Sequence, residues 1–594
     1  MKAGNLKKAM ALAISAIMVF ALYACSGSEN PGGSNAPSNS SGSSNSNGNG
    51  GGGQNSQGSS SQNPSESSNP LPPVVPIYDP PITIKIGGVA SVQADSTDAD
   101  LYTNNWFTLY KECGINMEYM WIVPAAQQDT KMSTAIASGS YPDIFTVKTT
   151  QYVTYATTGV IADITDLYND MITDNGREYL DSDAGAGLRS ALVGGRLYGM
   201  PTLGNPYDNM LVLFLRGDWL NKLGLPMPTT VDEVFNIAKA FTEQDPDGNG
   251  RNDTYGLALD GSSVFSYNSG IQAFCEMFGA APGFWDTKFT FVKNWDGDGL
   301  VWGGMHPGMK PALQMLQDMH KAGYLRSDMG VMNGEDVGTD IKAGKVGMWF
   351  MPIWGNMGGT RSLLTTNPDS DADIVTVPLP GVDANNPGRA LKPTAIQDYF
   401  CVSSKCEYPD VLMNLFTLSV DKLMFPQSPE EYDHFSEWKS SLFCGLNPLK
   451  NVDNYNRLRP AVENRDPSGL FSEEQKSNYA SIIYTLDWTG RRDDEEYLTG
   501  LSLYKVFVDP QGSSAAMDMV IKDSRRMNDL MYTDALTSNM IKKFATLDKL
   551  VKETIIKIIY GDPVSNWDAM LDNWWSLGGD IVTEEANDWY NANK

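Results

Sequence analysis

The stretch "INMEYMWIVPAAQQDTKMSTAIASGSYPDIFTV", residues 115–147, contains the pattern that decides the fold. Residues 115–124 read as a strand, and residues 127–142 read as a helix followed by its exit at a Tyr-Pro pair. The sequence DIFTV, residues 143–147, is typical of a short buried strand. A strand, a helix and a second strand in this order predict parallel pairing through a crossover helix.

The neighbouring segments extend the same alternation. Upstream, ITIKIGG (82–88) alternates as a strand does, and residues 101–114 predict a helix that ends at Gly114. Downstream, residues 209–224 read as a strand that runs into a helix. The fold class is therefore predicted to be α/β.

Two further segments carry local signals. Residues 228–244 predict a helix that begins with a capping box formed by Thr230 and Glu233. The sequence NWDGDGLVWGG (294–304) has only two aspartates within reach of each other. It is interpreted as a hairpin turn between apolar strands rather than as a metal site.

The N-terminus predicts export. Lysines at positions 2, 7 and 8 precede an apolar run, residues 9–22, that is too short to span a bilayer comfortably. The sequence LYAC ends at Cys25 and resembles a bacterial lipobox, although Tyr23 departs from the small residue usual there. Residues 1–25 are thus predicted to be a lipoprotein signal peptide with Cys25 lipidated, and ordinary signal cleavage without a lipid is the alternative. Residues 26–81, rich in Ser, Gly, Asn and Pro, predict a disordered tether.

Composition limits the classes of partner. The formal net charge of −27 makes nucleic acid an unlikely partner, because phosphate binding needs clustered lysine and arginine. The 14 tryptophans and 26 tyrosines exceed what a core needs, so some are expected to line a ligand surface. The five cysteines other than Cys25 are expected to be buried thiols, with a disulfide among the last three left open; they are Cys113, Cys275, Cys401, Cys406 and Cys444.

Common catalytic signatures are absent from the sequence. There are three histidines and none has zinc-ligand spacing, and there is no nucleophile elbow or phosphate-binding loop. A carboxylate pair for catalysis leaves no sequence signature among 71 acidic residues, so it stays open. Since nothing argues positively for catalysis, the protein is expected not to be an enzyme.

The sequence DPDGNGRNDTYG, residues 245–256, has the spacing of a calcium loop. Oxygen-bearing residues stand at positions 1, 3, 5 and 9, and Gly250 stands at position 6, where the loop must turn sharply. Position 12 is Gly256, where a calcium-binding helix–loop–helix carries a glutamate. The residues alone leave three interpretations: a metal site, a broken metal site or an acidic surface turn.

Several segments resemble one protein family in their order and spacing. They are YPDIF (141–145), GGRLYGMP (194–201), LFLRGDWLNKLGLPMPTTVDEV (213–234), AGKVGMWFMPIWG (343–355) and WWSLGGDIVTEEANDWY (574–590). From Ile82 on, the chain resembles the extracellular solute-binding proteins, family 1, of carbohydrate ABC transporters, which are often bacterial lipoproteins. The resemblance implies a two-lobe periplasmic-binding-protein-like fold (type II) with a ligand cleft between the lobes. The lobes are expected at 82–204 with 366–440, and at 205–365 with 441–594.

The resemblance also bears on the calcium loop. Family members with oligosaccharide ligands carry a structural Ca²⁺ after the same helix. The positions that carry over are Asp245, Asp247, Asn249, the carbonyl of Arg251, and Asp253. Thr254 stands where the family often has a glutamate, which implies weaker binding. An acidic surface turn remains the alternative.

The same family implies where a ligand contacts the chain. Trp354, after the turn that follows a strand, is the leading contact, whereas Trp349 is expected in the core. The other predicted ligand-binding residues are Lys148, Thr149, Gln151, Tyr207, Asp398, Tyr399 and Trp488. For each of these, core packing or an exposed loop is an equally good interpretation.

These observations predict a lipid-anchored protein on the extracellular face of the cell membrane. It is expected to capture a sugar or oligosaccharide, as a monomer, and to deliver it to the permease subunits of an ABC importer, with the membrane contacted through the lipid anchor only. Two alternatives stay open: a secreted hydrolase or lyase acting on polysaccharide, and a peptide-binding importer component.

Overall fold

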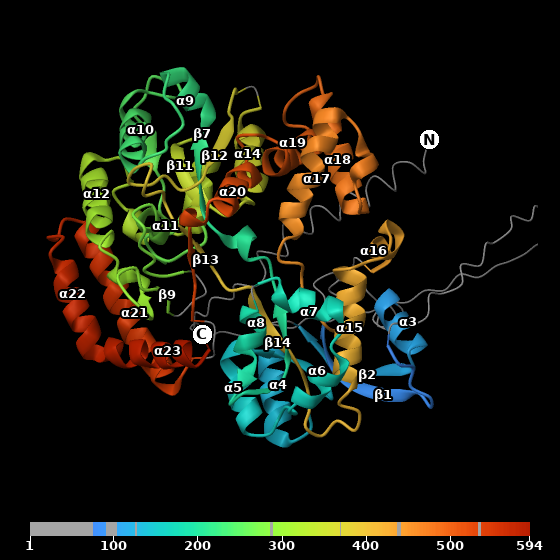
Figure 1. Ribbon diagram of the computed structural model, residues 1–594. Coiled ribbons are helices and arrows are strands. Elements are labelled where there is room, and N and C mark those ends of the chain that lie inside the picture. Colours follow the sequence, from blue (N-terminus) through green and yellow to red (C-terminus); the bar gives the residue numbers. More distant parts are fainter. Residues whose placement is uncertain are drawn as a thin grey trace, which may run out of the picture. The chain divides into compact units, whose positions relative to one another are not determined.

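Two mixed β-sheets organise the chain. The computed structural model describes residues 75–90, 104–124, 127–183, 185–284, 289–368, 370–435, 441–532 and 536–593, and Figure 1 shows it as a ribbon. The predicted signal peptide, Cys25 and nearly all of the predicted tether lie outside these residues. Among the described residues, no helix combines the length and the apolar character needed to cross a membrane.

The first sheet contains the strands predicted around residue 115. Its order is β2–β1–β3–β14–β6, and the bounds are β1 Ile82–Ala90, β2 Ile115–Pro124, β3 Ile144–Lys148, β6 Met200–Leu203 and β14 Ile396–Val402. β1 pairs in parallel with β2 and β3, whereas β14 lies antiparallel between β3 and β6 (Figure 1). The crossover helices are α3 (Asn105–Glu112) and α4 (Gln128–Ser138), and α5 (Thr149–Thr157) follows β3. The predicted parallel pairing is confirmed.

Local chemistry explains the first crossover. The Asn104 side chain accepts a hydrogen bond from the Phe107 N–H at 2.9 Å and so caps α3. The segment ends at Gly114, whose φ of 74° is left-handed, and a Cβ there would lie 2.2 Å from the Tyr78 carbonyl oxygen. Only glycine fits this turn, which brings the chain into β2.

The second sheet has the order β12–β7–β11–β8. Its strands are β7 Val212–Arg216, β8 Tyr255–Leu257, β11 Val346–Met351 and β12 Ile374–Val377. β7 is antiparallel to both of its neighbours, and β11 is parallel to β8. Trp349 is fully buried and stacks on Phe214 with ring centroids 6.0 Å apart, so its predicted place in the core is confirmed.

Sheet membership corrects one predicted boundary. Residues 366–440 were assigned to the first lobe, but β12 hydrogen-bonds to β7 within the second sheet. The chain returns to the first sheet only at β14, after β13 (Ala390–Lys392), which pairs with β15 (Met527–Asp529). Backbone pairing with a distant strand decides the assignment, and the local sequence does not show it.

Two local predictions are confirmed. After α9 (Gly217–Leu223), α10 (Val231–Glu243) begins with the capping box of Thr230 and Glu233. Residues 294–299 connect β9 (Phe291–Lys293) with β10 (Leu300–Trp302), which are antiparallel, so this segment is a hairpin turn. The five cysteines in the described residues are free thiols, and three of them are buried.

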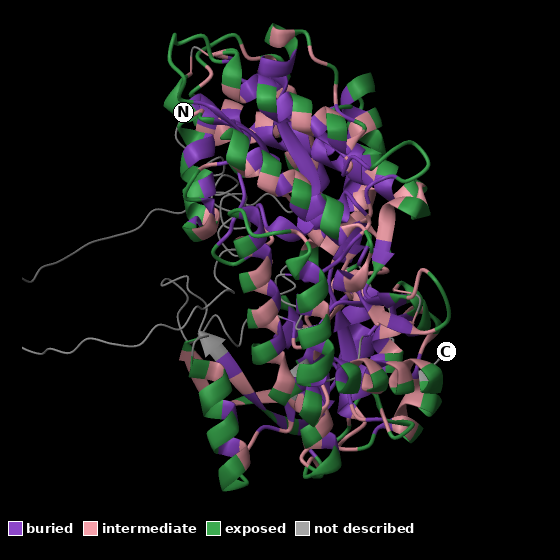
Figure 2. Ribbon diagram, turned by 90° about the vertical axis from the view of Figure 1, so that its left-hand side faces the viewer, coloured by how far each residue is buried: buried purple, intermediate pink, exposed green. Residues whose placement is uncertain are grey.

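Helices surround and extend the sheets. The remaining long helices are α12 Met309–Ala322, α13 Gly334–Lys342, α14 Gly355–Thr366, α15 Val411–Leu423, α17 Lys450–Asn464, α18 Glu473–Leu486, α19 Glu495–Phe507, α20 Ser513–Lys522, α21 Ser538–Ile559, α22 Asn566–Trp574 and α23 Asp580–Asn593. Helices α17–α20 share a core of their own around Leu458, Ile482 and Val506. Figure 2 shows many strand residues in purple, because they are buried, and exposed green residues on many helices.

Candidate functional site

The first sheet presents polar residues at the edge where the chain leaves it. Lys148, the last residue of β3, lies opposite Asp398 of β14, and Ile396 lies opposite Leu203, the last residue of β6. The parallel strands β1 and β3 also end toward this edge. Ligands of open α/β sheets bind outside the carboxyl ends of such strands. The chain departs from here toward the second sheet at Gly204.

The second sheet receives the chain at the corresponding edge. Val212, the first residue of β7, lies opposite Met351, the last residue of β11, and Val377 at the end of β12 lies opposite Leu213. The chain therefore enters and leaves this sheet where the parallel strands β8 and β11 end. Trp354 lies three residues after the last residue of β11 and directly before α14, at this edge.

An ion pair marks the edge of the first sheet. Lys148 Nζ lies 3.1 Å from Asp398 Oδ2, with the lysine side chain 57% exposed and the aspartate side chain 19% exposed. Thr202 fixes the backbone of Asp398, since its hydroxyl donates to the Asp398 carbonyl at 2.9 Å. Gln151 is half-buried in α5, and Thr149 begins this helix, but its side chain is outside the described part of the structure.

The connection between the sheets carries Tyr207. It lies in the short 3-10 helix η2 (Pro206–Asn209), with Lys392 Nζ 5.6 Å from its ring centroid. The next residue, Asp208, is buried and accepts hydrogen bonds from the Asn205 amide at 3.0 Å and the Asn451 amide at 2.5 Å. Burial raises the pKa of Asp208 to about 6. These contacts tie the connection to α17.

A small pocket of about 10 Å³, large enough for about one water, lies beside this connection. Its lining residues come from η2, the end of β11, α17 and α20, and are Tyr207, Asp208, Ile353, Asn451, Val452, Tyr455, Ser514, Met517, Asp518 and Ile521. The buried Ser514 hydroxyl has no hydrogen-bond partner among the described residues. Buried polar groups are nearly always paired, so this hydroxyl indicates a site for water or a ligand hydroxyl.

Trp354 is half-buried where two cores meet. Its ring packs against the core of the second sheet and against the helical core, with an edge-on contact to Phe507 at 5.9 Å between centroids. The Ser513 hydroxyl donates to the Ile353 carbonyl at 2.6 Å and holds the turn before it. The structure thus brings Trp354, Ile353 and Tyr207 to one region.

Tyr399 does not lie on a ligand surface. It is 1% exposed, stacks on Tyr152 at 3.8 Å between centroids, and its hydroxyl donates to Ser190 Oγ at 2.9 Å. Side chains alternate along a strand, so Asp398 and Tyr399 must face opposite sides of the sheet. The structure places Tyr399 on the core side.

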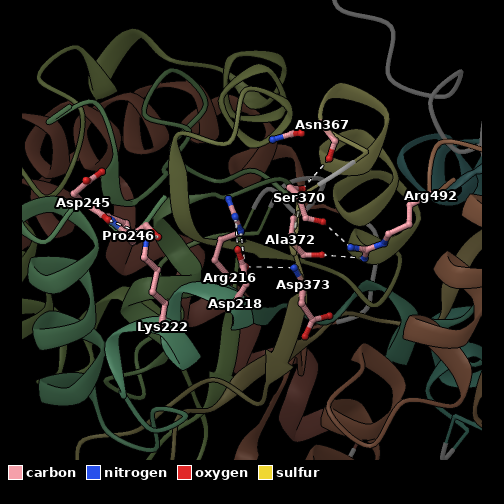
Figure 3. A network of polar contacts seen from close by, with 10 residues as sticks. All are labelled: Arg216, Asp218, Lys222, Asp245, Pro246, Asn367, Ser370, Ala372, Asp373 and Arg492. Carbon is pink, nitrogen blue, oxygen red and sulfur yellow. Dashed lines mark hydrogen bonds and ion pairs between the residues drawn. The ribbon is translucent and has the colours of Figure 1, made fainter. Parts of the chain in front are cut away.

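Trp488 lies away from the other predicted contacts. Its indole N–H donates to the Arg491 carbonyl at 2.9 Å, and the neighbouring Arg492 binds the carbonyl of Ser370 at 2.6 Å (Figure 3). Ser370 precedes β12, whose first residue pairs with Arg216 at the end of β7. This is the edge of the second sheet opposite to Trp354, so the structure does not bring the two tryptophans together.

Two aromatic residues at the first edge were missed in the sequence. Tyr119 lies in the middle of β2 and Trp121 two residues further on, and their rings cover glycines of β1. A Cβ at Gly88 would lie 2.6 Å from the Tyr119 ring, and one at Gly87 would lie 3.0 Å from the Trp121 indole. The signal was a glycine pair at the end of a strand, which indicates close approach by another group.

The loop after α10 folds as a compact acidic turn. Asp245 accepts hydrogen bonds from the backbone N–H groups of Asn249 and Gly250 at 3.1 and 3.0 Å. The Asn249 amide nitrogen donates to Asp247 at 2.7 Å and to Asp253 at 3.0 Å. Lys222 donates to the carbonyl of Pro246 at 2.8 Å (Figure 3). Gly248 and Gly250 both have left-handed φ angles, as the sharp turn requires.

The predicted residues of this loop, except Thr254, are of the types that bind a calcium ion. Asp245, Asp247, Asn249 and Asp253 offer side-chain oxygens, as calcium prefers, and the three carboxylates each accept a hydrogen bond from Asn249. Thr254 is buried, and its hydroxyl donates to the Phe241 carbonyl at 2.8 Å, because it begins the approach to β8. Thr254 is therefore part of the helix packing rather than a ligand. Among the described residues, no three acidic, histidine or cysteine side chains already converge as metal ligands.

Comparison with known proteins identifies the family. Residues 93–417 match the family of bacterial extracellular solute-binding proteins. The chain belongs to this family. This solute-binding protein is 26% identical over 245 residues to the polygalacturonan/rhamnogalacturonan-binding protein YtcQ of Bacillus subtilis, a match that covers 41% of this chain and 44% of YtcQ, less than half of that relative's length.

Two further relatives extend the match over most of this solute-binding protein. Lipoprotein LipO of Bacillus subtilis is 20% identical over 494 residues, covering 82% of this chain and 88% of LipO. The structure of an EF-hand mutant of FusA, an ABC-transporter substrate-binding protein of Streptococcus pneumoniae in complex with fructo-nystose, superposes with a TM-score of 0.51 and 16% identity. It covers 86% of this chain and 100% of that one, and so supports the two-lobe α/β fold. YtcQ and FusA are named as binding proteins rather than enzymes.

Proposed function

We propose that this protein captures a sugar or oligosaccharide at the two sheet edges and hands it to an ABC importer. The observation that carries the proposal is that the carboxyl ends of parallel strands in both sheets meet the connections between them, with Tyr207 and Trp354 placed there. Aromatic rings pack on the C–H faces of sugars, and the unpaired Ser514 hydroxyl suits a hydroxyl-rich ligand. The names of YtcQ and FusA support the same ligand class.

The alternatives receive less support. A hydrolase or lyase would need a catalytic pair at the site, whereas the carboxylate of Asp398 is occupied by Lys148 and that of Asp208 by two amides. A peptide ligand needs backbone groups to pair with, and both sheet edges described above are strand ends rather than open strand sides. We therefore propose a binding role without catalysis.

Replacing Trp354 with alanine should weaken oligosaccharide binding by about 1–3 kcal/mol, because a ring that stacks on a sugar face is lost. The ligand is first found by a thermal-shift screen of oligosaccharides, and the change is then measured by isothermal titration calorimetry. Trp575→Ala is the matched control, since Trp575 is 38% exposed on the C-terminal helices. Unchanged affinity of the Trp354 variant, with an intact melting curve, would remove Trp354 from the site.

We also propose that the loop holds a structural Ca²⁺ through Asp245, Asp247, Asn249, the Arg251 carbonyl and Asp253. The EF-hand of FusA supports this proposal. A ligand of the native state adds about 2.7 kcal/mol at a hundredfold excess over its Kd, so a chelator should lower the melting temperature. Sugar affinity should change little, because the loop follows α10 and not a strand end of the site.

The calcium measurement compares melting curves with calcium and with chelator. Asp247→Ala should abolish the difference, whereas Asp296→Ala, in the hairpin turn between β9 and β10, should keep it. Melting temperatures that chelator leaves unmoved in the wild type would show that the loop is only an acidic turn.

Anchoring and lobe division complete the proposal. We propose that Cys25 is lipidated, that residues 26–81 form the tether, and that a monomer contacts the membrane through the lipid only. Cys25→Ser should release the protein into the medium or leave an uncleaved precursor, as seen by fractionation and immunoblotting. A variant of mature size that still fractionates with membranes would contradict the anchor. The lobes proposed are those predicted, with β12 and β13 moved to the second.

A further inference from the structure

The lysines at the candidate site are paired with carboxylates. Lys148 lies 3.1 Å from Asp398, and Lys392, which also contacts the Tyr207 ring, lies 2.8 Å from Asp529. A third lysine begins α17 beside the pocket: Lys450 lies 2.7 Å from Glu474. Each lysine thus has an anion within contact distance.

Arg389 and Lys131 are two further cations in the described part of the chain. Arg389, which precedes β13, donates to the Met527 carbonyl at 3.2 Å, and its buried Nε has no hydrogen-bond partner among the described residues. Burial lowers the pKa of Arg389, and Asp529, which pairs with Lys392, partly opposes this shift. The negative charge of Asp183 also raises the pKa of Lys392. Lys131 has no carboxylate in contact among the described residues. It lies 5.4 Å from the ring of Trp121 in β2, which is the edge strand opposite to β6 in the first sheet.

A negatively charged sugar would have to compete with these carboxylates. Binding a uronate at Lys148 would bring a second carboxylate beside Asp398 or displace Asp398 from its partner. Asp398 is only 19% exposed, so it would be left poorly solvated, and like charges across an interface are strongly disfavoured. The formal net charge of −27 also opposes the approach of a polyanion.

A neutral sugar meets none of these costs. Its hydroxyl groups both donate and accept, and an ion pair offers an ammonium donor next to a carboxylate acceptor. The half-buried rings of Trp354 and Tyr207 suit apolar sugar faces. We propose that the ligand of this solute-binding protein is an uncharged saccharide and that uronate-containing chains are rejected by charge. This inference rests on the proposed function and names the ligand class of the same site, in contrast to what the name of YtcQ says of that protein.

The test uses saccharides that differ in charge. Thermal shift and calorimetry compare a neutral panel (fructo-, malto-, cello-, galacto- and chito-oligosaccharides) with an acidic panel (oligogalacturonates and alginate oligosaccharides). Tetragalacturonate and its full methyl ester form a pair with the same linkages and opposite charge state. Titrations are repeated in low-salt and high-salt buffer, because pairing with a charged ligand is screened by salt.

The expected result is a tightest binder from the neutral panel, with affinity that changes less than about twofold with salt. A uronate as tightest binder, with affinity that falls at least about tenfold at high salt, would overturn the inference and leave the proposed function standing. Binding of no saccharide from either panel would overturn the proposed function, and the inference with it.

A variant tests the ion pair directly. Asp398→Asn leaves Lys148 without its carboxylate, so the affinity for uronates relative to the neutral binder should rise about tenfold. Asp548→Asn is the matched control, because Asp548 is 21% exposed and pairs with Lys552 at 3.0 Å within α21, away from the pocket. A neutral-to-uronate ratio that Asp398→Asn leaves at the wild-type value would overturn the role of this pair in charge rejection.

Discussion

Replacing Lys505 with methionine should lower the free energy of unfolding by about 3–5 kcal/mol, because it breaks a buried ion cluster. Lys505 Nζ lies 2.6 Å from both Asp373 Oδ1 and Asp509 Oδ2. The Lys505 side chain is 9% exposed and that of Asp509 is 12% exposed. Removing the cation leaves two carboxylates close together, one of them buried.

The position of this cluster explains why its loss should matter. Asp373 directly precedes β12, and its N–H donates to Asp218 at 3.3 Å (Figure 3). Lys505 lies in the last turn of α19, and Asp509 follows the end of that helix. The cluster therefore links the core formed by helices α17–α20 to the second sheet.

Urea unfolding followed by tryptophan fluorescence measures the effect. Lys522→Met is the matched control, since Lys522 is 72% exposed and its pair with Asp518 should contribute at most about 1 kcal/mol. Equal unfolding midpoints for the two variants would show that the cluster does not contribute to stability.

Glu276→Gln should stabilise the protein at pH 8 by as much as about 4–5 kcal/mol and have little effect near pH 4.5. Glu276 is buried in α11 (Ile271–Glu276), and Oε2 accepts a hydrogen bond from the Leu391 N–H at 3.2 Å. Oε1 has no hydrogen-bond partner among the described residues. Burial raises the pKa of Glu276 from its ordinary value of 4.5 to about 8.

The direction of the effect follows from the proton balance. Between pH 4.5 and pH 8 the unfolded chain releases this proton whereas the native state keeps it, so stability falls by about 1.4 kcal/mol per pH unit. Glutamine keeps the shape and an acceptor for Leu391, but it has no proton to lose. Unfolding curves at several pH values measure this, with the exposed Glu584→Gln as control. If wild type and Glu276→Gln follow the same pH dependence, Glu276 is not the buried acid that sets it.

The elements built on local signals were predictable. Residues 115–124 alternate in polarity and include β-branched side chains, as strands do, and the structure has β2 over the same range. The capping box of Thr230 and Glu233 needs only four residues, so it was readable from the chain alone. The place of β14 between β3 and β6 was not, because strands pair through backbone groups that every residue carries.

The candidate site was predicted in part. Lys148 and Asp398 were both nominated and the structure brings them into contact, but neither their pairing nor the ligand they bind is written in the local sequence. The prediction for Tyr399 is wrong because the sequence of β14 does not show which of its alternating side chains face the covered side of the sheet. The structure places Trp488 apart from Trp354, and its position depends on how the turn after α18 meets the segment before β12.

The position of β14 has a consequence for how the protein is made. Until residue 402 has emerged, β3 and β6 each present an open edge to whatever lies nearby. Open strand edges are templates for wrong strand pairing, so a nascent chain that stalls before β14 is prone to misfolding and to aggregation with other chains. Completion of the first sheet is thereby postponed until the second sheet has been synthesised, which favours a chain that stays unfolded during export and folds late, as a whole.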